Sequence, residues 1–460
     1  MPVITRLAPS PTGFMHIGTA KIALYNWLYA RQHGGRFALR IEDTDRSEGR
    51  YFPEAVEVIY NELRWLGLEW DELVPSQFAR GARHAEVARE LLAQGAAYEC
   101  YLSPAETEAL REESRKTGKP VRSPYRDPAY PKPEGVVPAL RLCMPESGTT
   151  VVHDIIQGDI TIANETLEDL VILRSDGTPT YNLSVVVDDH DMEITHVIRG
   201  ADHINNTPKQ IQIYRAMGWE APAFAHIPLI LAMDGSKMSK RHGGATTAEY
   251  RDAGYLPEAL LNFLIRLGWA HGDKEIFSRK EMLALWRLED ALKAPAKFDG
   301  KKLLELNAIY IRSASDARLS ELLMPFMGEL SEADRVRVAR GVPFMKERAK
   351  TLLEMAAMAR VYLVDSWARG EMDEKALRAA SGFSHYGEVA GDLRALPDWN
   401  ASVINDYFKS KSDAFGMKIG EFAAAMRAAI AGASVSPPLA EAMEIIGREE
   451  SVRRTRELSK

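Results

Sequence analysis

The stretch Ala8-Pro9-Ser10-Pro11-Thr12-Gly13-Phe14-Met15-His16-Ile17-Gly18-Thr19 separates two segments of different periodicity. Before it, residues 3–8 are rich in apolar side chains and predict a short strand. After it, residues 19–33 repeat apolar side chains at helical spacing, with Leu24 and Leu28 on one face. A loop that joins a strand to a helix lies at the carboxyl edge of a parallel sheet, where open α/β sheets bind ligands. The stretch therefore predicts an α/β fold and the edge that carries its binding site.

The segments that follow continue the alternation of strands and helices. Residues 37–41 predict a second strand, Pro53 suits the first turn of the next helix, and Asp176-Gly177 predicts a hairpin turn. Later segments predict a return to the first sheet, with strands at 185–188, 195–199 and 226–231 and a helix at 208–217. Beyond about residue 250 the pattern predicts only helices. Successive strands joined by helices favour a parallel, doubly wound sheet.

The composition is that of an ordinary globular chain of several domains. Its 460 residues are too many for one core, and 46% hydrophobic with 27% charged residues is typical of globular proteins. No apolar run is long enough to span a bilayer, and the N-terminus lacks the features of a secretory signal. Cys100 and Cys143 are too few for a disulfide framework, so a reducing cytoplasm is the expected location.

The net charge of −7 argues against a nucleic-acid partner for the chain as a whole, although charge can be concentrated locally. Residues 335–350 carry several basic side chains and a single acidic one, Glu347. The basic residues are Arg335, Arg337, Arg340, Lys346, Arg348 and Lys350. On charge alone, a solvated helix face is the simpler interpretation and a contact for RNA the alternative.

Two short motifs carry the chemistry. His16 can donate to a phosphate as charge builds in a transition state, and Gly18 lets a nucleotide approach the helix N-terminus. The second motif, Lys237-Met238-Ser239-Lys240-Arg241, predicts a cationic loop that closes on a triphosphate and stabilises the departing pyrophosphate. Each motif has a structural alternative, since His16 can simply cap the helix and the lysines can simply form an exposed basic loop.

Together, a His-x-Gly turn after the first strand and a Lys-Met-Ser-Lys loop after the last resemble the class I aminoacyl-tRNA synthetases. Other stretches resemble the bacterial glutamyl branch of that family: Thr5-Arg6-Leu7-Ala8-Pro9, Arg40-Ile41-Glu42-Asp43-Thr44-Asp45, Tyr181-Asn182-Leu183, Val186-Val187-Asp188-Asp189-His190 and Asp202-His203-Ile204-Asn205-Asn206-Thr207-Pro208. Thr19, where many class I enzymes have a second histidine, is usual in this branch. The resemblance extends through residues 254–262 and becomes weak beyond about residue 312.

The resemblance implies an α/β Rossmann-type catalytic domain with an α+β insertion, followed by all-α C-terminal domains. The expected Rossmann domain comprises residues 1–75 and 183–235, and the insertion, which would bind the acceptor end of tRNA, comprises residues 76–182. Residues 236–312 are expected to form a stem-contact domain that carries the Lys-Met-Ser-Lys loop. Residues 313–460 are expected to form a helical anticodon-binding region of two subdomains that divide near residue 370.

A glutamate site must satisfy two carboxylates and one ammonium. We expect Arg6 and Arg199 to pair with the carboxylates, because a guanidinium can bind a carboxylate in two places. Glu42, helped by Ser10, is expected to bind the ammonium, and Tyr181 to donate to the side-chain carboxylate. The amide of glutamine would leave an arginine poorly paired. The structural alternative is a salt bridge between Arg6 and Glu42 across neighbouring strands.

The resemblance also implies that ATP with Mg²⁺ activates the amino acid. The residues expected to bind ATP are Pro9, Thr12, His16, Gly18, Ser239 and Lys240, and those expected to act in catalysis are His16, Gly18, Lys237 and Lys240. Glutamate would attack the α-phosphorus, and its acyl group would then pass to the 3′ end of tRNA(Glu) without a protein nucleophile. The family is expected to require bound tRNA before it activates glutamate.

A helical C-terminal region favours an anticodon-reading synthetase over relatives that carry β-barrels there or end soon after the Lys-Met-Ser-Lys loop. It makes Arg348, Arg335 and Lys346 candidate tRNA contacts, with Arg348 a candidate reader of the third anticodon base. Whether tRNA(Gln) is also charged stays open. We expect the chain to act as a monomer.

Some family members bind zinc in the insertion, but the corresponding segments here are Cys100-Tyr101-Leu102 and Tyr125-Arg126-Asp127. A structural zinc prefers four nitrogen or sulfur ligands, so we predict no zinc. Two other classes of function remain, an RNA-independent nucleotidyltransferase of the pantothenate-synthetase type and a synthetase-derived binding protein without catalysis. The length and helical C-terminus argue against the first, and intact His16, Glu42 and Lys240 argue against the second.

Overall fold

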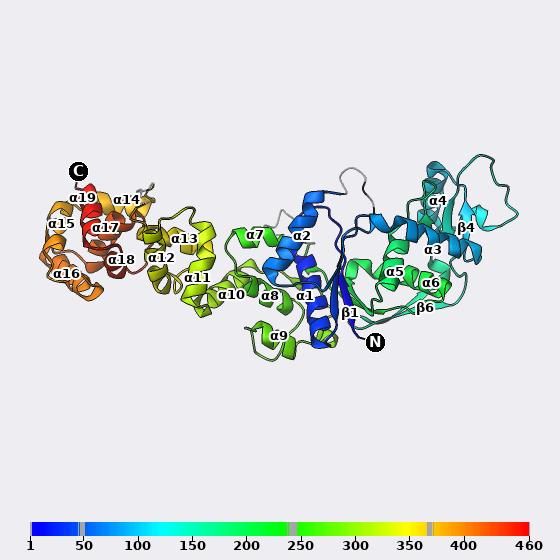
Figure 1. Cartoon of the computed structure of the whole chain (residues 1–460), viewed down its shortest axis with the longest axis horizontal. Helices are drawn as coiled ribbons and strands as arrows, with labels where there is room; N and C mark the ends of the chain where they lie inside the picture. Colours follow the sequence, from blue (N-terminus) through cyan, green and yellow to red (C-terminus); the bar gives the residue numbers. More distant parts are fainter. Residues whose placement is uncertain are drawn as a thin grey trace. The chain divides into compact units, whose positions relative to one another are not determined.

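The computed structural model describes residues 2–44, 46, 51–236, 238, 246–365, 370 and 372–459. These residues form two compact units. The N-terminal unit comprises Met1–Glu249 and Leu261–Asp299, and the C-terminal unit comprises Tyr250–Leu260 and Gly300–Lys460 (Figure 1). The predicted sheet and its ligand-binding edge belong to the N-terminal unit.

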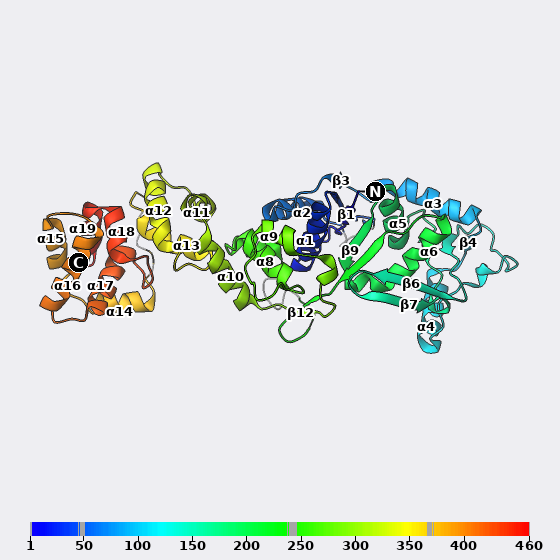
Figure 2. The same ribbon diagram turned by 90° about the horizontal axis from the view of Figure 1, so that it is seen from below.

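A seven-stranded sheet organises the N-terminal unit, with the strand order β3-β2-β1-β9-β10-β6-β7 (Figure 2). Its strands are β1 (Ile4–Leu7), β2 (Arg36–Arg40), β3 (Glu72–Val74), β6 (Thr149–Asp154), β7 (Gly158–Ala163), β9 (His196–Gly200) and β10 (Ala223–Ile227). Neighbouring strands run parallel except β6 and β7, which are antiparallel. The predicted parallel α/β sheet is confirmed, and the carboxyl ends of β1 and β9 lie side by side.

Helix α1 (Ile17–Gln32) follows β1 through the short loop that the sequence predicts, and it packs against β1, β2 and β9. On another side it is covered by α9 (Arg279–Leu285) and by Trp286, whose ring centroid lies 4.9 Å from that of Tyr25. Most of the helix is therefore buried, including one charged residue, Lys21. Helix α2 (Pro53–Leu66) begins at the predicted proline.

The predicted strand at 185–188 is wrong, because these residues lie in helix α5 (Tyr181–Asp191). Residues 185–187 are three consecutive buried valines. A short apolar run of β-branched residues fits a buried strand as well as a buried helix, and periodicity does not distinguish the two. Helix α5 packs against α6 (Thr207–Met217), which confirms the helix expected at 208–217.

The segment 226–231 is not one strand as predicted. Strand β10 ends at Ile227, and Pro228, which has no backbone N–H to offer a neighbour, follows it. A second short strand, β11 (Ile230–Leu231), pairs with β12 (Ala296–Lys297). The prediction of helices alone beyond residue 250 is therefore wrong at Ala296–Lys297, which forms β12.

The predicted insertion contributes to two sheets. Strands β4 (Ala97–Cys100), β5 (Ala139–Leu142) and β8 (Val171–Leu173) form a three-stranded antiparallel sheet. Helix α3 (Gly81–Ala93) packs against this sheet, and helix α4 (Pro104–Thr117) follows β4 in the sequence. Between β5 and β8, the chain supplies β6 and β7 to the large sheet. The predicted turn at Asp176-Gly177 is confirmed by the Arg174–Thr178 backbone hydrogen bond of 2.8 Å and by a positive φ of 83° at Gly177.

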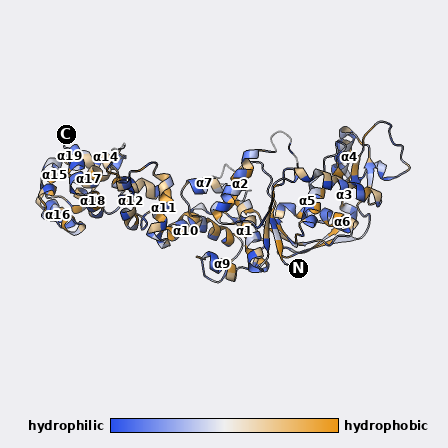
Figure 3. Cartoon of the chain, viewed as in Figure 1, coloured by the Kyte–Doolittle hydropathy of each residue, from blue (hydrophilic) through white to orange (hydrophobic). Residues whose placement is uncertain are grey.

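The C-terminal unit is built from helices around one apolar core. They are α10 (Gly300–Ser313), α11 (Asp316–Leu323), α12 (Glu332–Met345), α13 (Leu352–Ala359), α14 (Glu374–Ser381), α15 (Tyr386–Ala395), α16 (Ala401–Ala414), α17 (Ile419–Ala431), α18 (Leu439–Ile446) and α19 (Arg448–Glu457). Figure 3 shows apolar and polar residues interspersed along them, as amphipathic helices require. Of the described helices, none has the length and apolar character to cross a bilayer.

Candidate functional site

The carboxyl edge of the large sheet holds a cavity of about 450 Å³. All five residues predicted to bind glutamate line it: Arg6, Ser10, Glu42, Tyr181 and Arg199. They come from β1, the loop after it, the loop after β2, the first turn of α5 and β9. A backbone hydrogen bond of 2.9 Å from Glu42 N to the carbonyl oxygen of Pro9 joins the first two loops. The fold thus brings together residues that are far apart in the sequence.

Arg6 is held by Asp189 on α5. Its Nε donates to Oδ1 at 3.2 Å and its Nη2 to Oδ2 at 3.3 Å, and the side chain is 3% exposed. The structural alternative, a salt bridge between Arg6 and Glu42, is therefore wrong, because Arg6 pairs with Asp189. Glu42 instead accepts from Arg40 Nη2 at 3.2 Å. Among the described residues, no hydrogen bond is recorded for the Nη1 of Arg6, which leaves that nitrogen for a ligand.

Sequence reasoning missed Arg40 and Asp189, which connect these groups. Arg40 is fully buried and also donates from Nη1 to Asp189 Oδ1 at 2.7 Å. Burial alone would raise the pKa of Asp189, but Arg40 and Arg6 outweigh it and hold that pKa below its usual range. Burial raises the pKa of Glu42, although the charge of Arg40 partly offsets this by lowering it. A bound ammonium would favour the charged form of Glu42, as its predicted role requires.

Arg199 is buried without a carboxylate. Its Nη2 donates to Thr207 Oγ1 and to Gln210 Oε1, each at 2.8 Å, and its Nε donates to His226 Nε2 at 3.1 Å. No ion pair to Arg199 is recorded among the described residues, and burial lowers its pKa. An unpaired buried cation is costly, so this side of the cavity is suited to an anionic ligand.

Tyr181 and His203 form the polar wall between the two arginines. The Tyr181 hydroxyl lies 3.0 Å from His203 Nδ1. Burial raises the pKa of Tyr181 to about 12, while burial and then Arg199 lower the pKa of His203 to about 4. Both groups are therefore neutral at physiological pH. Tyr181 can donate to a carboxylate there, and His203 was missed by the sequence reasoning.

A second cavity of about 350 Å³ adjoins the first, since Thr19, Ile22, Gly200 and Asp202 line both. It is lined by His16 and Gly18, as predicted for the ATP site. His16 stands at the N-cap of α1, but its side chain makes no cap hydrogen bond, so the structural alternative for this residue is not supported.

The remaining predicted ATP residues are distributed differently. Pro9 lines the first cavity, and Thr12 is not among the lining residues of either cavity. Lys237, Ser239 and Lys240 lie outside the described residues. Met238, which is described, lines the second cavity.

Lys21 also lines the second cavity and was missed by the sequence reasoning. It is 1% exposed, and burial lowers its pKa to about 8. Its position in the sequence, three residues after Gly18 in the apolar first half of the helix, was the available signal. A buried ammonium at this place adds positive charge to a site predicted to bind phosphates.

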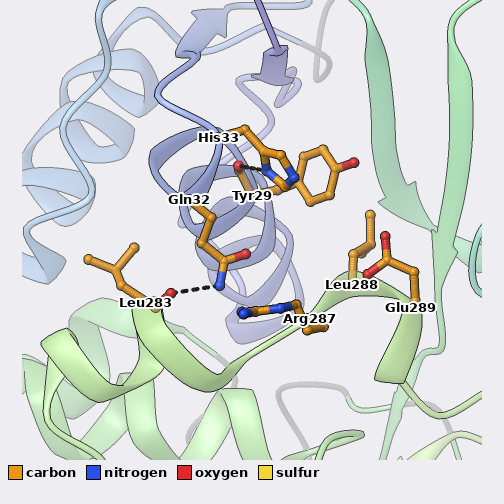
Figure 4. A pocket seen from close by; sticks show the side chains of 7 residues that line it. All are labelled: Tyr29, Gln32, His33, Leu283, Arg287, Leu288 and Glu289. Atoms are coloured by element: carbon orange, nitrogen blue, oxygen red, sulfur yellow. Dashed lines mark hydrogen bonds between the residues drawn. The ribbon is translucent and has the colours of Figure 1, made fainter.

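A third cavity, of about 380 Å³, lies at the opposite end of α1 and contains no predicted site residue (Figure 4). There Gln32 Nε2 donates to the carbonyl oxygens of Leu283 at 2.8 Å and of Trp286 at 2.6 Å. His33 Nδ1 lies 2.8 Å from the carbonyl oxygen of Tyr29. The two bonds from Gln32 attach the 283–286 segment to α1 and indicate a structural role.

In the C-terminal unit, part of the predicted basic cluster is neutralised locally. Lys346 pairs with Asp316 and Lys350 with Glu305, each at 2.6 Å. Arg348 Nη1 instead donates to the carbonyl oxygen of Ser436 at 3.3 Å. Ser436 Oγ accepts from Arg427 Nε at 3.1 Å, and burial and then Arg348 lower the pKa of Arg427.

Two arginines thus meet at one serine, and Arg427 joins Arg348 as a candidate RNA contact. Arg335 is exposed on α12. The sequence offered no reason to select Arg427, because it lies on a separate helix, α17.

Cys100, the remaining cysteine of the family's zinc segments, is engaged within the protein. Its thiol donates to Ser123 Oγ at 3.3 Å, and Arg141 Nε donates to its sulfur at 3.2 Å. Across the described part of the chain, no group of three or more His, Cys, Asp or Glu side chains is placed to hold a metal ion. The absence of zinc stays a prediction.

Both the N-terminal and the C-terminal part of the chain match known protein families. The family described as tRNA synthetases class I (E and Q), catalytic domain, matches residues 2–305, and the anticodon binding domain family matches residues 318–458. The chain is 49% identical to glutamate–tRNA ligase 2 of Paramagnetospirillum magneticum, over 99% of this chain and 97% of that protein. It is 48% identical to glutamate–tRNA ligase 2 of Rhodospirillum rubrum, over 99% of each.

A solved structure has the same architecture. The chain is similar to a glutamate tRNA ligase from Elizabethkingia meningosepticum in complex with its amino acid, with a TM-score of 0.83 and 30% identity. The match covers 100% of this chain and 99% of the other. The resemblance that the motifs suggested therefore extends over the full length.

We predict that Asp189→Asn lowers the free energy of unfolding of the N-terminal unit by about 3 kcal/mol, because it leaves the buried Arg6 without its counterion and removes one of the carboxylates that pair with Arg40. Urea denaturation at neutral pH measures this. The pKa of Asp189 is lower in the folded protein than in the unfolded chain. Its contribution to the free energy of unfolding is therefore fully present above the unfolded pKa and is lost as the pH falls through the folded pKa. The difference in stability between the parent and Asp189→Asn should accordingly shrink below about pH 4. The control Asp191→Asn, on the same helix but partly exposed, should cost less than about 1 kcal/mol. Equal losses would contradict the argument.

We predict that Gly18→Ala leaves the melting temperature unchanged but weakens ATP binding about tenfold. A Cβ at residue 18 meets no atom of the described residues within 4 Å beyond its chain neighbours and its own helix backbone, so it enters the cavity rather than the core. Calorimetric titration with ATP measures the affinity. Gly81→Ala, on α3, has equally open surroundings and should leave ATP binding unchanged. A loss of stability without a loss of affinity would show that Gly18 serves the fold.

Proposed function

The chain belongs to the glutamate–tRNA ligase family of class I aminoacyl-tRNA synthetases and joins glutamate to tRNA(Glu), and we propose that it binds the amino acid in the cavity between β1 and β9. One observation carries the proposal: the guanidinium of Arg199 is buried in this cavity among neutral acceptors. The side-chain carboxylate of glutamate would supply the missing counterion.

The other groups of the cavity suit the rest of the amino acid. Arg6, with one nitrogen left by Asp189, would bind a second carboxylate oxygen, and Glu42 with Ser10 would bind the ammonium. Tyr181 would donate to the side-chain carboxylate beside Arg199. Glutamine would place a neutral amide against a buried cation, which explains how the site would reject it.

The adjoining cavity would hold ATP so that the two substrates meet. A carboxylate oxygen of glutamate attacks the α-phosphorus, the bond to pyrophosphate breaks, and glutamyl-adenylate forms. The terminal ribose hydroxyl of tRNA then attacks the acyl carbon and releases AMP. His16 would donate to a phosphate oxygen as charge builds, and the sequence supplies Lys237 and Lys240 for the departing pyrophosphate. Mg²⁺ would arrive with the phosphates of ATP.

In the C-terminal unit, we propose that Arg348 and Arg427 face the anticodon together at Ser436. The match of residues 318–458 to an anticodon binding family supports an RNA contact here. Arg335 is exposed and remains a candidate contact, whereas Lys346 is engaged by Asp316. The monomeric state, the cytoplasmic location and the domain boundaries stay predictions.

We predict ATP–pyrophosphate exchange that requires both glutamate and purified tRNA(Glu). Arg199→Lys should raise the KM for glutamate about 100-fold, because an ammonium cannot replace the three-point contacts and the fork of a guanidinium. Arg215→Lys, exposed on α6 and away from the cavity, is the matched control and should match the parent. Exchange without glutamate dependence would support an RNA-independent nucleotidyltransferase, and no exchange with tRNA present would support an inactive binding protein.

We predict that Arg348→Gln changes the ratio of kcat/KM for tRNA(Glu) over tRNA(Gln) by about tenfold. Loss of one charged contact to a base removes roughly 1–3 kcal/mol of discrimination. Charging of the two purified tRNAs side by side measures the ratio. Arg340→Gln, exposed on α12, is the control and should leave the ratio as in the parent. If Arg348→Gln also keeps the parental ratio, the assignment of Arg348 is wrong.

A further inference from the structure

Three neighbouring strands place a carboxylate, an imidazole and the cavity's guanidinium in one row. In the parallel register, Arg199 on β9 is the partner of His226 on β10, and Asp154 on β6 is the partner of Phe224, two residues before His226. His226 Nδ1 lies 2.5 Å from Asp154 Oδ2, and its Nε2 lies 3.1 Å from Arg199 Nε. Asp154 is 5% exposed and His226 is fully buried.

The row has one consistent hydrogen-bonding arrangement. The Nε of an arginine only donates, so Nε2 of His226 accepts and the ring proton sits on Nδ1, from which it is donated to Asp154. The other oxygen of Asp154 accepts from the backbone N–H groups of Ile156 at 3.0 Å and Gln157 at 2.7 Å. The carboxylate is thus fixed by the turn after β6, and it fixes the tautomer of the histidine in turn.

The surrounding charges keep this arrangement. Burial lowers the pKa of His226; Asp154 from β6 opposes this, and Arg199 from β9 and Arg6 from β1 add to it. His203, on the 3₁₀ helix Ala201–Asn206, is neutral and also faces the imidazole. His226 is therefore neutral near physiological pH, as an acceptor must be.

We propose that His226 and Asp154 are positioning residues, which orient Arg199 for the side-chain carboxylate of glutamate without neutralising its charge. This inference rests on the proposed function of the cavity. A carboxylate directly against Arg199 would pair with it and compete with the substrate. A neutral imidazole orients the guanidinium through a hydrogen bond but leaves its charge for the ligand, and the negative charge of Asp154 stays one residue further away.

The test compares three variants with the parent in the exchange assay. His226→Gln keeps a side-chain acceptor, His226→Leu removes it, and Asp154→Asn loses the charge that fixes the tautomer. We expect the KM for glutamate to rise about tenfold in His226→Leu and Asp154→Asn and to stay within about threefold in His226→Gln, with the KM for ATP unchanged in all. The preference for glutamate over glutamine should fall with the rise in KM.

The pH dependence separates orientation from mere packing. In the parent, the KM for glutamate should rise as the pH falls toward the depressed pKa of His226, because an imidazolium no longer accepts from Arg199. In His226→Gln this acid limb should be reduced, since an amide does not titrate. Circular dichroism and the melting temperature identify any variant that fails to fold, and His226→Gln, which retains size and acceptor, then decides the question.

Two failures are distinguishable. If Arg199→Lys leaves the KM for glutamate unchanged, the cavity is misassigned and the proposed function fails. If Arg199→Lys weakens glutamate binding but the His226 and Asp154 variants keep the parental KM, selectivity and pH profile, only the positioning inference is overturned.

Discussion

Asp189 accepts hydrogen bonds from two buried guanidinium groups, and the cavity proposed to bind the amino acid depends on this interaction. Arg6 and Arg40 come from neighbouring strands, and the shared carboxylate lowers the cost of burying both cations. Because Asp189 is on α5, the shared carboxylate also fixes that helix against the sheet. It thereby places Tyr181, at the start of the same helix, on the wall of the cavity.

The two arginines of the cavity are held by opposite strategies. Arg6 is neutralised by Asp189 and keeps one nitrogen for a ligand, whereas Arg199 is held only by neutral groups and keeps its whole charge. The cavity therefore contains the uncompensated positive charge of Arg199. It is also lined by a carboxylate, that of Glu42. This asymmetry is suited to an amino acid whose side chain, unlike that of glutamine, is an anion.

The sequence predicted the parts of this site that local rules determine. The β1–α1 loop, the helix start at Pro53 and the turn at Gly177 follow from turn and capping chemistry, and the structure has them where expected. The strand expected at 185–188 was wrong, because three valines satisfy a buried helix and a buried strand alike.

Three further residues, Arg40, Asp189 and Arg427, could not be selected from the sequence for a different reason. Each is a charged side chain whose function comes from burial or from a partner on another element, and neither property is visible before the chain is folded. The motif stretches contained Arg40 and Asp189 but gave no sign that they pair. The residues proposed to bind glutamate could be predicted because a substrate with known charges specifies their complements, and the structure places them around one cavity.

The place of β6 has a consequence for how the enzyme is assembled. A chain that carried residues 76–182 as a wholly separate insertion would leave β10 as the edge of the sheet and His226 without Asp154. Instead the insertion returns two strands to the large sheet, and Gln157 Nε2 donates to the carbonyl oxygen of His226 at 2.9 Å. Strand β6, which the insertion supplies, ends at the carboxylate that holds His226, so the hydrogen bonds from Asp154 through His226 to Arg199 depend on its position.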